Sequence, residues 1–92
     1  MKPVNYDNLT PQERRAVRNK YIEFQGGLCA HCGAPLDKEP SPDVLALEVD
    51  AKRFPSGFFY WPVHLHHDHK TGMTIGAVHN HCNAVLWQYH GE

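Results

Sequence analysis

The clearest hydrophobic pattern lies near the N-terminus. Apolar side chains recur at Val17, Tyr21 and Phe24, the spacing of one face of an α-helix. The segment 10–13, Thr-Pro-Gln-Glu, is a capping box with proline at the first helical position, and a pair of glycines follows the last apolar residue. We therefore predict a helix over residues 11–25 with this apolar stripe buried.

The second half of the chain has a different pattern. Residues 61–67 favour extended structure, residues 70–72 (Lys-Thr-Gly) have turn chemistry, and residues 73–78 are rich in β-forming side chains. Residues 80–89 then have a helical pattern with apolar positions on one side. The predicted order is strand, turn, strand, helix.

Composition limits the class of protein. The chain has 92 residues, 41% of them hydrophobic and 21% charged, with a formal net charge of −1, which is typical of one small globular domain spanning residues 1–92. No apolar run approaches the ~20 residues of a membrane span, and the N-terminus lacks an apolar signal region. We expect a cytoplasmic protein with reduced thiols and no membrane partner.

Two pairs of candidate ligands predict a metal site. Cys29 and Cys32 form a C-x2-C knuckle over residues 29–33, and His79 and Cys82 form an H-x2-C pair further along the chain. Two residues between ligands let both side chains reach one ion, and three cysteines with one histidine are a common zinc ligand set. We assign these four residues to a structural zinc ion.

Two alternatives to this assignment stay open. His81 could replace His79, although a ligand one residue before Cys82 is poorly placed for chelation. Cys29 and Cys32 could instead form a redox pair or a disulfide, since a C-x-x-C motif alone is not specific. Structural zinc sites in small domains supply about 10–16 kcal/mol of apparent binding free energy, which would decide whether so short a chain folds.

The segment between the two halves is irregular and acidic. Within residues 34–62 only 44–49 has an ordered pattern, either a short strand or a helical turn. Residues 58–61 (Phe-Phe-Tyr-Trp) are a dense aromatic run. The simplest interpretation is that these rings fill the core under the zinc knuckle, and a platform for stacked bases is the alternative.

Positive charge gathers in the predicted N-terminal helix. The first 25 residues carry five cations against three acids, although the whole chain is slightly acidic. A solvated helix face would explain these cations, and contact with phosphates is the functional alternative. The candidate contacts to nucleic-acid phosphates are Arg14, Arg15, Arg18 and, in the predicted hairpin turn, Lys70.

Histidine is the residue type that departs most from average usage. Six of the eight histidines lie between His64 and His81, and residues 64–69 (His-Leu-His-His-Asp-His) hold four of them. Such a density of titratable ligands is hard to explain by core packing, so we expect a functional site here.

The order of these motifs resembles that of the HNH endonucleases, also called the ββα-metal or His-Me finger superfamily, and most closely the phage recombination endonuclease VII group. The shared layout is a C-x-x-C knuckle, a strand ending in His-His-Asp-His, a Lys-Thr-Gly turn, a second strand, and a metal pair closing in Cys82-Asn83. It covers residues 27–87. The resemblance implies a small α+β fold: an N-terminal helix, the zinc knuckle, and a ββα motif over about 61–90 held by structural zinc.

The same resemblance implies an activity and its residues. His66 and Asn83 would hold one catalytic divalent ion (Mg²⁺, Mn²⁺ or Ni²⁺), His67 would be the general base, and His69 would contact the scissile phosphate or the metal. The substrate would be DNA, cleaved by nicking or double-strand cleavage to 5′-phosphate and 3′-hydroxyl ends. The family's arginine before the glycine of the second strand is Ile75 here, so that phosphate contact is either absent or supplied by the N-terminal helix.

If the adjacent residues His66 and His67 are to act on the same phosphate, the backbone of the strand must bring their side chains to one face. Neighbouring residues of a regular strand point to opposite faces of the sheet. His66 and His67 can therefore serve one phosphate only if the strand ends or bulges between them.

The main alternative function is a catalytically inert, zinc-stabilised module that binds nucleic acid or a protein, and a histidine-rich metal-storage protein is a third hypothesis. Asn83 discriminates between the first two, because a simple zinc ribbon has no use for an asparagine directly after its last cysteine. We expect a monomer or weak dimer, in the host-cell cytoplasm if the chain is phage-encoded, and a protein partner could supply targeting.

Overall fold

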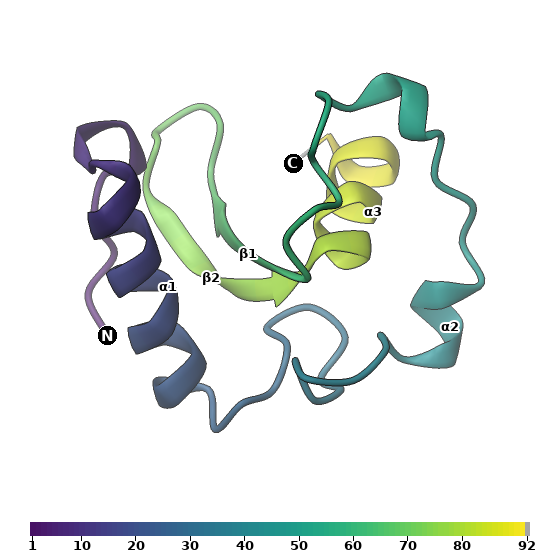
Figure 1. Cartoon of the computed structure of the whole chain (residues 1–92), viewed down its shortest axis with the longest axis horizontal. Coiled ribbons are helices and arrows are strands. Elements are labelled where there is room, and N and C mark those ends of the chain that lie inside the picture. Colours follow the sequence, from purple (N-terminus) through teal and green to yellow (C-terminus); the bar gives the residue numbers. More distant parts are fainter. Residues whose placement is uncertain (92) are drawn as a thin grey trace.

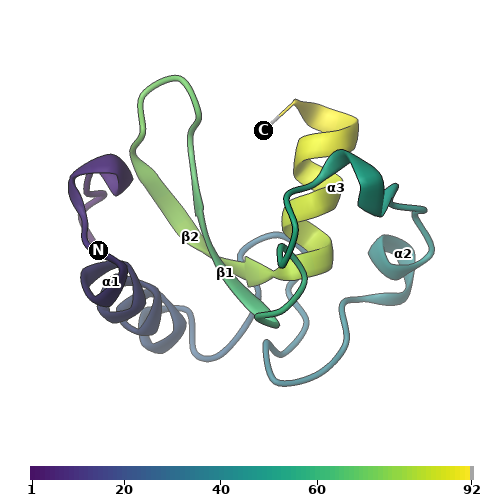
Figure 2. The same cartoon turned by 45° about the horizontal axis from the view of Figure 1, so that its top comes forward.

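Two helices lie on opposite sides of a β-hairpin in the computed structural model of the chain (Figures 1 and 2), which describes residues 1–91. The architecture is a small α+β fold with a two-stranded antiparallel sheet, as predicted. Within the described residues, no helix combines the length and apolar composition that a membrane crossing requires. The elements in chain order are η1 (Tyr6–Asn8), α1 (Pro11–Phe24), α2 (Pro42–Leu45), η2 (Ala51–Arg53), β1 (Val63–His67), β2 (Thr74–His79) and α3 (Asn80–His90).

The N-terminus of α1 is the predicted capping box. Thr10 Oγ1 accepts a hydrogen bond from the Glu13 amide (3.2 Å), and Glu13 Oε1 accepts one from the Thr10 amide (2.9 Å). Two amide groups that a helix start leaves unpaired are therefore satisfied, which is why the helix begins at Pro11.

The predicted burial of the α1 stripe is correct at two of its three positions. Tyr21 is buried with its hydroxyl 2.8 Å from Thr74 Oγ1, and Val17 packs against the same core. Phe24 was predicted to be buried but is 70% exposed. It lies in the last turn of α1, which no element within residues 1–91 covers on that side.

The hairpin contains the irregularity that the paired histidines demand. β1 and β2 align Val63 with His79 and His66 with Gly76, but the register shifts between His66 and His67. A bulge at this point lets two adjacent side chains leave their strictly alternating faces. The geometric expectation for these two histidines is therefore confirmed.

The N-terminal segment covers the outer edge of the hairpin. The Thr74 amide donates to Val4 O (2.8 Å), the Val4 amide donates to Thr74 Oγ1 (2.9 Å), and the Tyr6 amide donates to Gly72 O (2.8 Å). These bonds fix η1 against the hairpin turn. We had predicted no element in this segment.

The core lies where β2 runs into α3. The most deeply buried apolar side chains come from the end of one element and the start of the next. Gln25 ties α1 to this region, because its side-chain amide accepts from the Ala77 amide (2.9 Å) and donates to Ala77 O (3.0 Å). The buried apolar residues here are Ala77, Val78, Cys82, Ala84, Val85 and Leu86.

The central segment departs from the prediction at two places. The helical alternative for residues 44–49 holds only at 44 and 45, which end α2 (Pro42–Leu45), and residues 46–49 are neither helix nor strand. The aromatic run does not fill the core under the knuckle: Tyr60 is 76% and Trp61 is 54% exposed. Asn80 Nδ2 donates to the carbonyls of Phe59 and Trp61 (3.1 Å each). These bonds hold the loop at the start of α3, with the rings of Tyr60 and Trp61 exposed to solvent.

Gly72 provides a test of the N-terminal contact. It has φ +77°, and an added Cβ would lie 2.8 Å from Asn5 Oδ1 and 2.9 Å from Asp7 Oδ2. Gly57 has a similar φ of +82° but open space around it, so both alanine variants share a left-handed strain of about 1–2 kcal/mol. We expect Gly72→Ala to lower the free energy of unfolding by about 1 kcal/mol more than Gly57→Ala, measured by urea denaturation. Equal losses would contradict the packing of residues 4–7 on the hairpin.

Candidate functional site

The two predicted ligand pairs meet at one point. Cys29, Cys82 and His79 are buried, Cys32 is half-buried, and their four ligand atoms all lie within 4.8 Å of one another. Three sulfurs and one imidazole nitrogen at such separations suit the tetrahedral coordination of zinc. The cluster could therefore hold a structural metal ion such as zinc.

Local backbone structure presents each pair of ligands. In the knuckle, the Cys29 amide donates to Ala34 O (2.8 Å), and the Gly33 amide donates to Cys29 O (3.0 Å) with Gly33 at φ +79°. The other pair spans the junction of two elements, with His79 ending β2 and Cys82 in the first turn of α3. A tight turn and a helix start thus converge on one position.

The hydrogen bonds of His79 determine which ring nitrogen can bind a metal. His79 Nε2 lies 2.9 Å from both Pro35 O and Lys38 O. Carbonyl oxygens only accept, so Nε2 carries the proton. His79 Nδ1 is therefore the ring nitrogen that faces the thiols, 3.5 Å from the sulfurs of Cys32 and Cys82, and is the one placed to bind a metal. Carbonyl partners of this kind orient the imidazole of a metal ligand.

The structure contradicts His81 as a ligand and a Cys29–Cys32 disulfide. His81 does not replace His79, because its Nε2 lies 2.9 Å from Val44 O and helps to attach α2. Cys29 and Cys32 form no disulfide, since both are free thiols. The hydrogen bond between the thiols of Cys29 and Cys82 lowers the pKa of Cys29 and raises the pKa of Cys82. The cluster thus favours a thiolate, the form of cysteine that binds metal.

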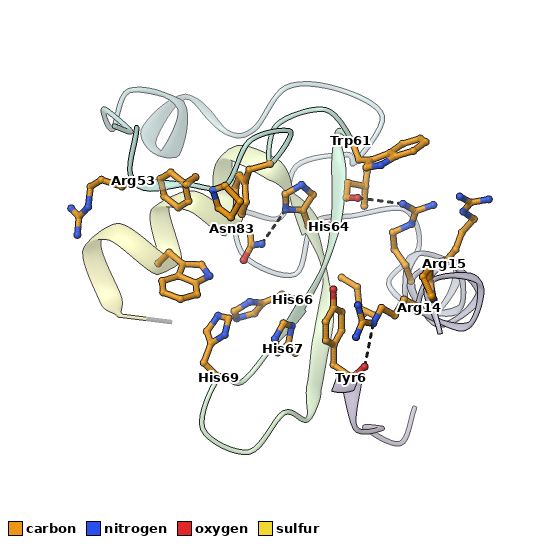
Figure 3. Close-up of a pocket in the computed structure, with 18 residues that line it drawn as sticks. Tyr6, Arg14, Arg15, Arg53, Trp61, His64, His66, His67, His69 and Asn83 are labelled. Atoms are coloured by element: carbon orange, nitrogen blue, oxygen red, sulfur yellow. Dashed lines mark hydrogen bonds between the residues drawn. The ribbon is translucent and has the colours of Figure 1, made fainter. Parts of the chain in front are cut away.

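A second site lies beside the bulge of β1. A cavity of about 710 Å³ opens there between α1, β1, α3 and the loop that precedes β1 (Figure 3). Strand β1 and the turn that follows it contribute four imidazoles, and α3 contributes one carboxamide. These residues are His64, His66, His67, His69 and Asn83.

Asn83 presents an oxygen to this cavity. Its Nδ2 is 3.0 Å from His64 Nδ1 and donates to it, so His64 is neutral with its proton on Nε2. Burial also lowers the pKa of His64, which favours the same neutral form. Asn83 Oδ1 is buried and has no hydrogen-bond partner within the described chain. A buried amide oxygen without a protein partner costs free energy unless a water molecule or a ligand satisfies it.

The ring of His67 is held by stacking. It lies flat on Tyr6, with centroids 3.9 Å apart and planes 9° apart, and Arg14 Cζ lies 3.9 Å from the Tyr6 centroid on the same ring. Burial is the largest cause of a lowered pKa at His67, and the positive charge of His69 adds to it. His67 is therefore a neutral, oriented imidazole near neutral pH.

His69 and His66 complete the histidine group. The His69 ring lies 4.7 Å from that of His67 and 4.1 Å from that of Trp87, so it bridges the hairpin and α3. His66 is buried on β1. In Figure 3 the rings of His66, His67 and His69 lie together beside the hairpin.

The lining of the cavity is strongly basic. Four arginines reach it, and none of the lining residues among the first 91 positions is aspartate or glutamate. Arg18 Nη1 donates to Val63 O at 3.5 Å, while Arg18 Nε is buried with no partner among residues 1–91. A cavity with guanidinium groups and no carboxylate attracts anions, although the chain as a whole is slightly acidic. The four residues are Arg14, Arg15, Arg18 and Arg53.

Most of the residues predicted to be catalytic or to contact DNA line this cavity. The exception is Lys70, which lies in the hairpin turn and does not line it. Asp68 also has a local role, because its carboxylate accepts from the amides of Lys70 (2.7 Å) and Thr71 (3.0 Å) and shapes the turn. The predicted residues that do line the cavity are His66, His67, His69, Asn83, Arg14, Arg15 and Arg18.

Sequence reasoning gave no site role to several lining residues, among them His64, Tyr6, Arg53 and Trp87. His64 was detectable, since it lies two residues before His66 and therefore on the same face of β1. Tyr6, Arg53 and Trp87 carry no local signal of their place in the cavity, because contacts across the fold bring them there. Comparison of the chain with protein-family models, curated proteins and solved structures found no match.

Zinc analysis tests the Cys3His cluster. We expect purified protein to carry a single equivalent of zinc, and we expect Cys82→Ser to lose the metal and unfold, because the lost binding free energy of about 10 kcal/mol equals the stability of a typical domain. Metal content and thermal unfolding measure both effects. His31→Ala is the control: His31 lies between the two knuckle cysteines but is exposed, so this variant should keep its zinc. A folded, metal-free Cys82→Ser protein would contradict a structural metal site.

Proposed function

We propose that the chain is a metal-dependent endonuclease of the HNH superfamily, related to the phage recombination endonuclease VII group, and that it hydrolyses phosphodiester bonds of DNA. The observation that carries the proposal is the cavity in which four histidines and Asn83 meet four arginines and, in the part of the chain that the structure describes, no carboxylate. Guanidinium groups bind phosphate oxygens, and imidazole transfers protons near neutral pH. The products would have 5′-phosphate and 3′-hydroxyl ends.

His67 is the proposed general base. Hydrolysis needs a group that takes a proton from the attacking water, and such a base works best when its pKa lies near the working pH. The bulge after His66 and the flat contact with Tyr6 support this role, because they orient the His67 ring within the cavity. His69, whose ring lies 4.7 Å from that of His67, would contact the scissile phosphate.

His66 and Asn83 are the proposed ligands of a catalytic divalent ion. The buried Oδ1 of Asn83, which lacks a protein partner, fits a cation that prefers oxygen. The imidazole of His66 shifts the preference toward softer ions such as Mn²⁺ or Ni²⁺, with Mg²⁺ still a candidate. When bound, such an ion neutralises charge that builds on the phosphate. The hydrogen bond from Asn83 Nδ2 to His64 selects the amide orientation that leaves the oxygen available.

The arginines of α1 are the proposed phosphate contacts. The family's arginine is replaced by Ile75 in β2, and Arg18, with its buried unpaired Nε, is a candidate to supply that charge from another element. Arg14 and Arg15 extend the basic wall along the same helix. In this proposal the Cys3His cluster is the structural zinc site of the HNH fold. It fixes the start of α3, the helix that carries Asn83.

An inert zinc module that binds nucleic acid or a protein is the second candidate. The same basic cavity would favour it. It gives no reason for the buried, unpartnered oxygen of Asn83 or for a bulge that brings His67 to the cavity, and for this reason we favour the nuclease.

Plasmid cleavage tests the activity. With zinc-loaded protein and Mg²⁺, Mn²⁺ or Ni²⁺, we expect supercoiled DNA to become nicked or linear, and we expect His67→Ala and Asn83→Ala to reduce the rate by about 10²-fold or more. Asn83→Asp keeps a ligand oxygen and should be more active than Asn83→Ala. His90→Ala is the matched histidine control, because His90 is exposed on α3 outside the cavity.

Each variant needs circular dichroism and zinc content equal to those of the parent chain. If the folded parent protein cleaves no duplex, branched or single-stranded DNA with any of these metals, the inert module is the better hypothesis.

Salt dependence of DNA binding tests the basic wall. We expect Arg15→Gln to lower the slope of log K against log salt concentration by about 1, because one phosphate contact is lost. Lys20→Gln removes the same charge from α1 at an exposed position outside the cavity and should change the slope less. Fluorescence anisotropy with labelled DNA measures both slopes. Equal changes in slope for Arg15→Gln and Lys20→Gln would mean that phosphates contact the cavity arginines no more than other cations of α1.

A further inference from the structure

We infer that the cavity takes an unpaired nucleotide, with its base stacked on Trp61, so that the preferred substrate is single-stranded or locally unpaired DNA. This inference rests on the proposed function, since it names the substrate class of the same cavity. The evidence for it is the aromatic part of the cavity lining, which has no role in the proposed hydrolysis of phosphodiester bonds.

The cavity lining combines arginines with aromatic rings. Three of the four arginines come from α1, and the aromatic rings, called the aromatic wall below, come from the loop before β1 and from α3. In Figure 3 Trp61 lies on the same side of the cavity as Arg14 and Arg15. At about 710 Å³ the space is much larger than a phosphate group requires. The residues of the aromatic wall are Phe54, Phe58, Trp61 and Trp87.

Two of these rings offer apolar surface to solvent. Trp61 is 54% and Trp87 is 44% exposed, although both are large aromatic side chains. Exposed apolar surface rimmed by polar groups marks an interaction site in a soluble domain. Arg15 Cζ lies 6.0 Å from the Trp61 ring, so one guanidinium and one indole are available side by side.

The aromatic wall is anchored beside the histidines. Asn80 Nδ2 donates to Trp61 O (3.1 Å), which ties this loop to α3. Phe58 packs against Phe54 with ring centroids 4.7 Å apart, and it meets the His64 ring edge-on, also at 4.7 Å. His64 in turn accepts the hydrogen bond from Asn83. A base held on this wall would thus lie next to the proposed reaction centre.

The geometry of nucleic acids selects the unpaired state. In a duplex each base is stacked between its neighbours, so a protein reaches only its edges and the phosphates. Aromatic side chains can use the face of a base only where the strand is unpaired, and such stacking contributes strongly to binding of single strands. Arginines beside exposed indoles match the alternating phosphates and bases of a single strand.

Fluorescence of a single indole gives a direct test. The chain has two tryptophans, so Trp87→Phe leaves Trp61 as the only one. With zinc-loaded protein and no added catalytic metal, we expect an oligothymidine to quench Trp61 emission and a duplex of the same length to quench it little. The same titrations give affinities.

Substitution then tests the contact itself. Trp61→Ala should weaken binding of labelled oligothymidine by roughly 10- to 100-fold, the usual effect of removing one stacking ring, and should change duplex binding much less. Phe24→Ala is the control, because Phe24 is a 70% exposed aromatic residue of α1 that does not line the cavity. Tyr60 is unsuitable, since its ring packs against that of Trp61 with centroids 5.0 Å apart. The Phe24→Ala control should leave binding of the single strand within about 2-fold of the parent protein.

The outcomes separate the two proposals. Equal affinity for single and duplex DNA, equal effects of Trp61→Ala and Phe24→Ala, or no quenching would each overturn the stacking site. Tight, Trp61-dependent binding of single strands without cleavage under any metal would support the stacking site and refute the nuclease. Cleavage of duplex DNA that is unaffected by Trp61→Ala would leave the nuclease standing and refute the stacking site.

Discussion

The rest of the structure depends on the convergence of four ligand side chains. Cys29 and Cys32 come from the turn after α1, while His79 and Cys82 straddle the junction of β2 and α3. An ion at this point would crosslink the two halves of a chain too small to rely on its apolar core alone. Asn83 directly follows Cys82, so the same crosslink sets the position of the amide in the cavity. The geometry of the cavity therefore depends on metal binding at the cluster, because Cys82 and Asn83 lie in the same turn of α3.

The sequence was informative wherever local chemistry decides the structure. The capping box at Thr10, the spacing of the ligand pairs and the need for a bulge at His66 each follow from a few neighbouring residues, and each is present in the structure. Phe24 and the aromatic run were assigned to the core because they are apolar. Whether another element covers a side chain is a long-range property, and a single sequence does not contain it. The place of Tyr6 in the cavity is also a long-range property, because its backbone amide bonds to Gly72 in the distant hairpin turn.

Charge is distributed unevenly in the fold. The chain has ten acidic and nine basic side chains, yet within residues 1–91 no carboxylate lines the cavity. Five of the acids lie in residues 37–50, away from the arginines of α1. Net charge therefore understates the positive field at the histidines, where burial already disfavours the protonated forms of His64 and His67. An anion entering the cavity would supply the negative charge that this region lacks.

Tyr6 and Trp87 line the same cavity although they lie near opposite ends of the described chain. Each makes a ring contact with a histidine of the hairpin region, Tyr6 with His67 and Trp87 with His69. The consequence concerns folding. Neither half of the described chain contains the finished cavity on its own. Any activity of this cavity therefore requires that the N-terminal segment and α3 have both docked beside the hairpin.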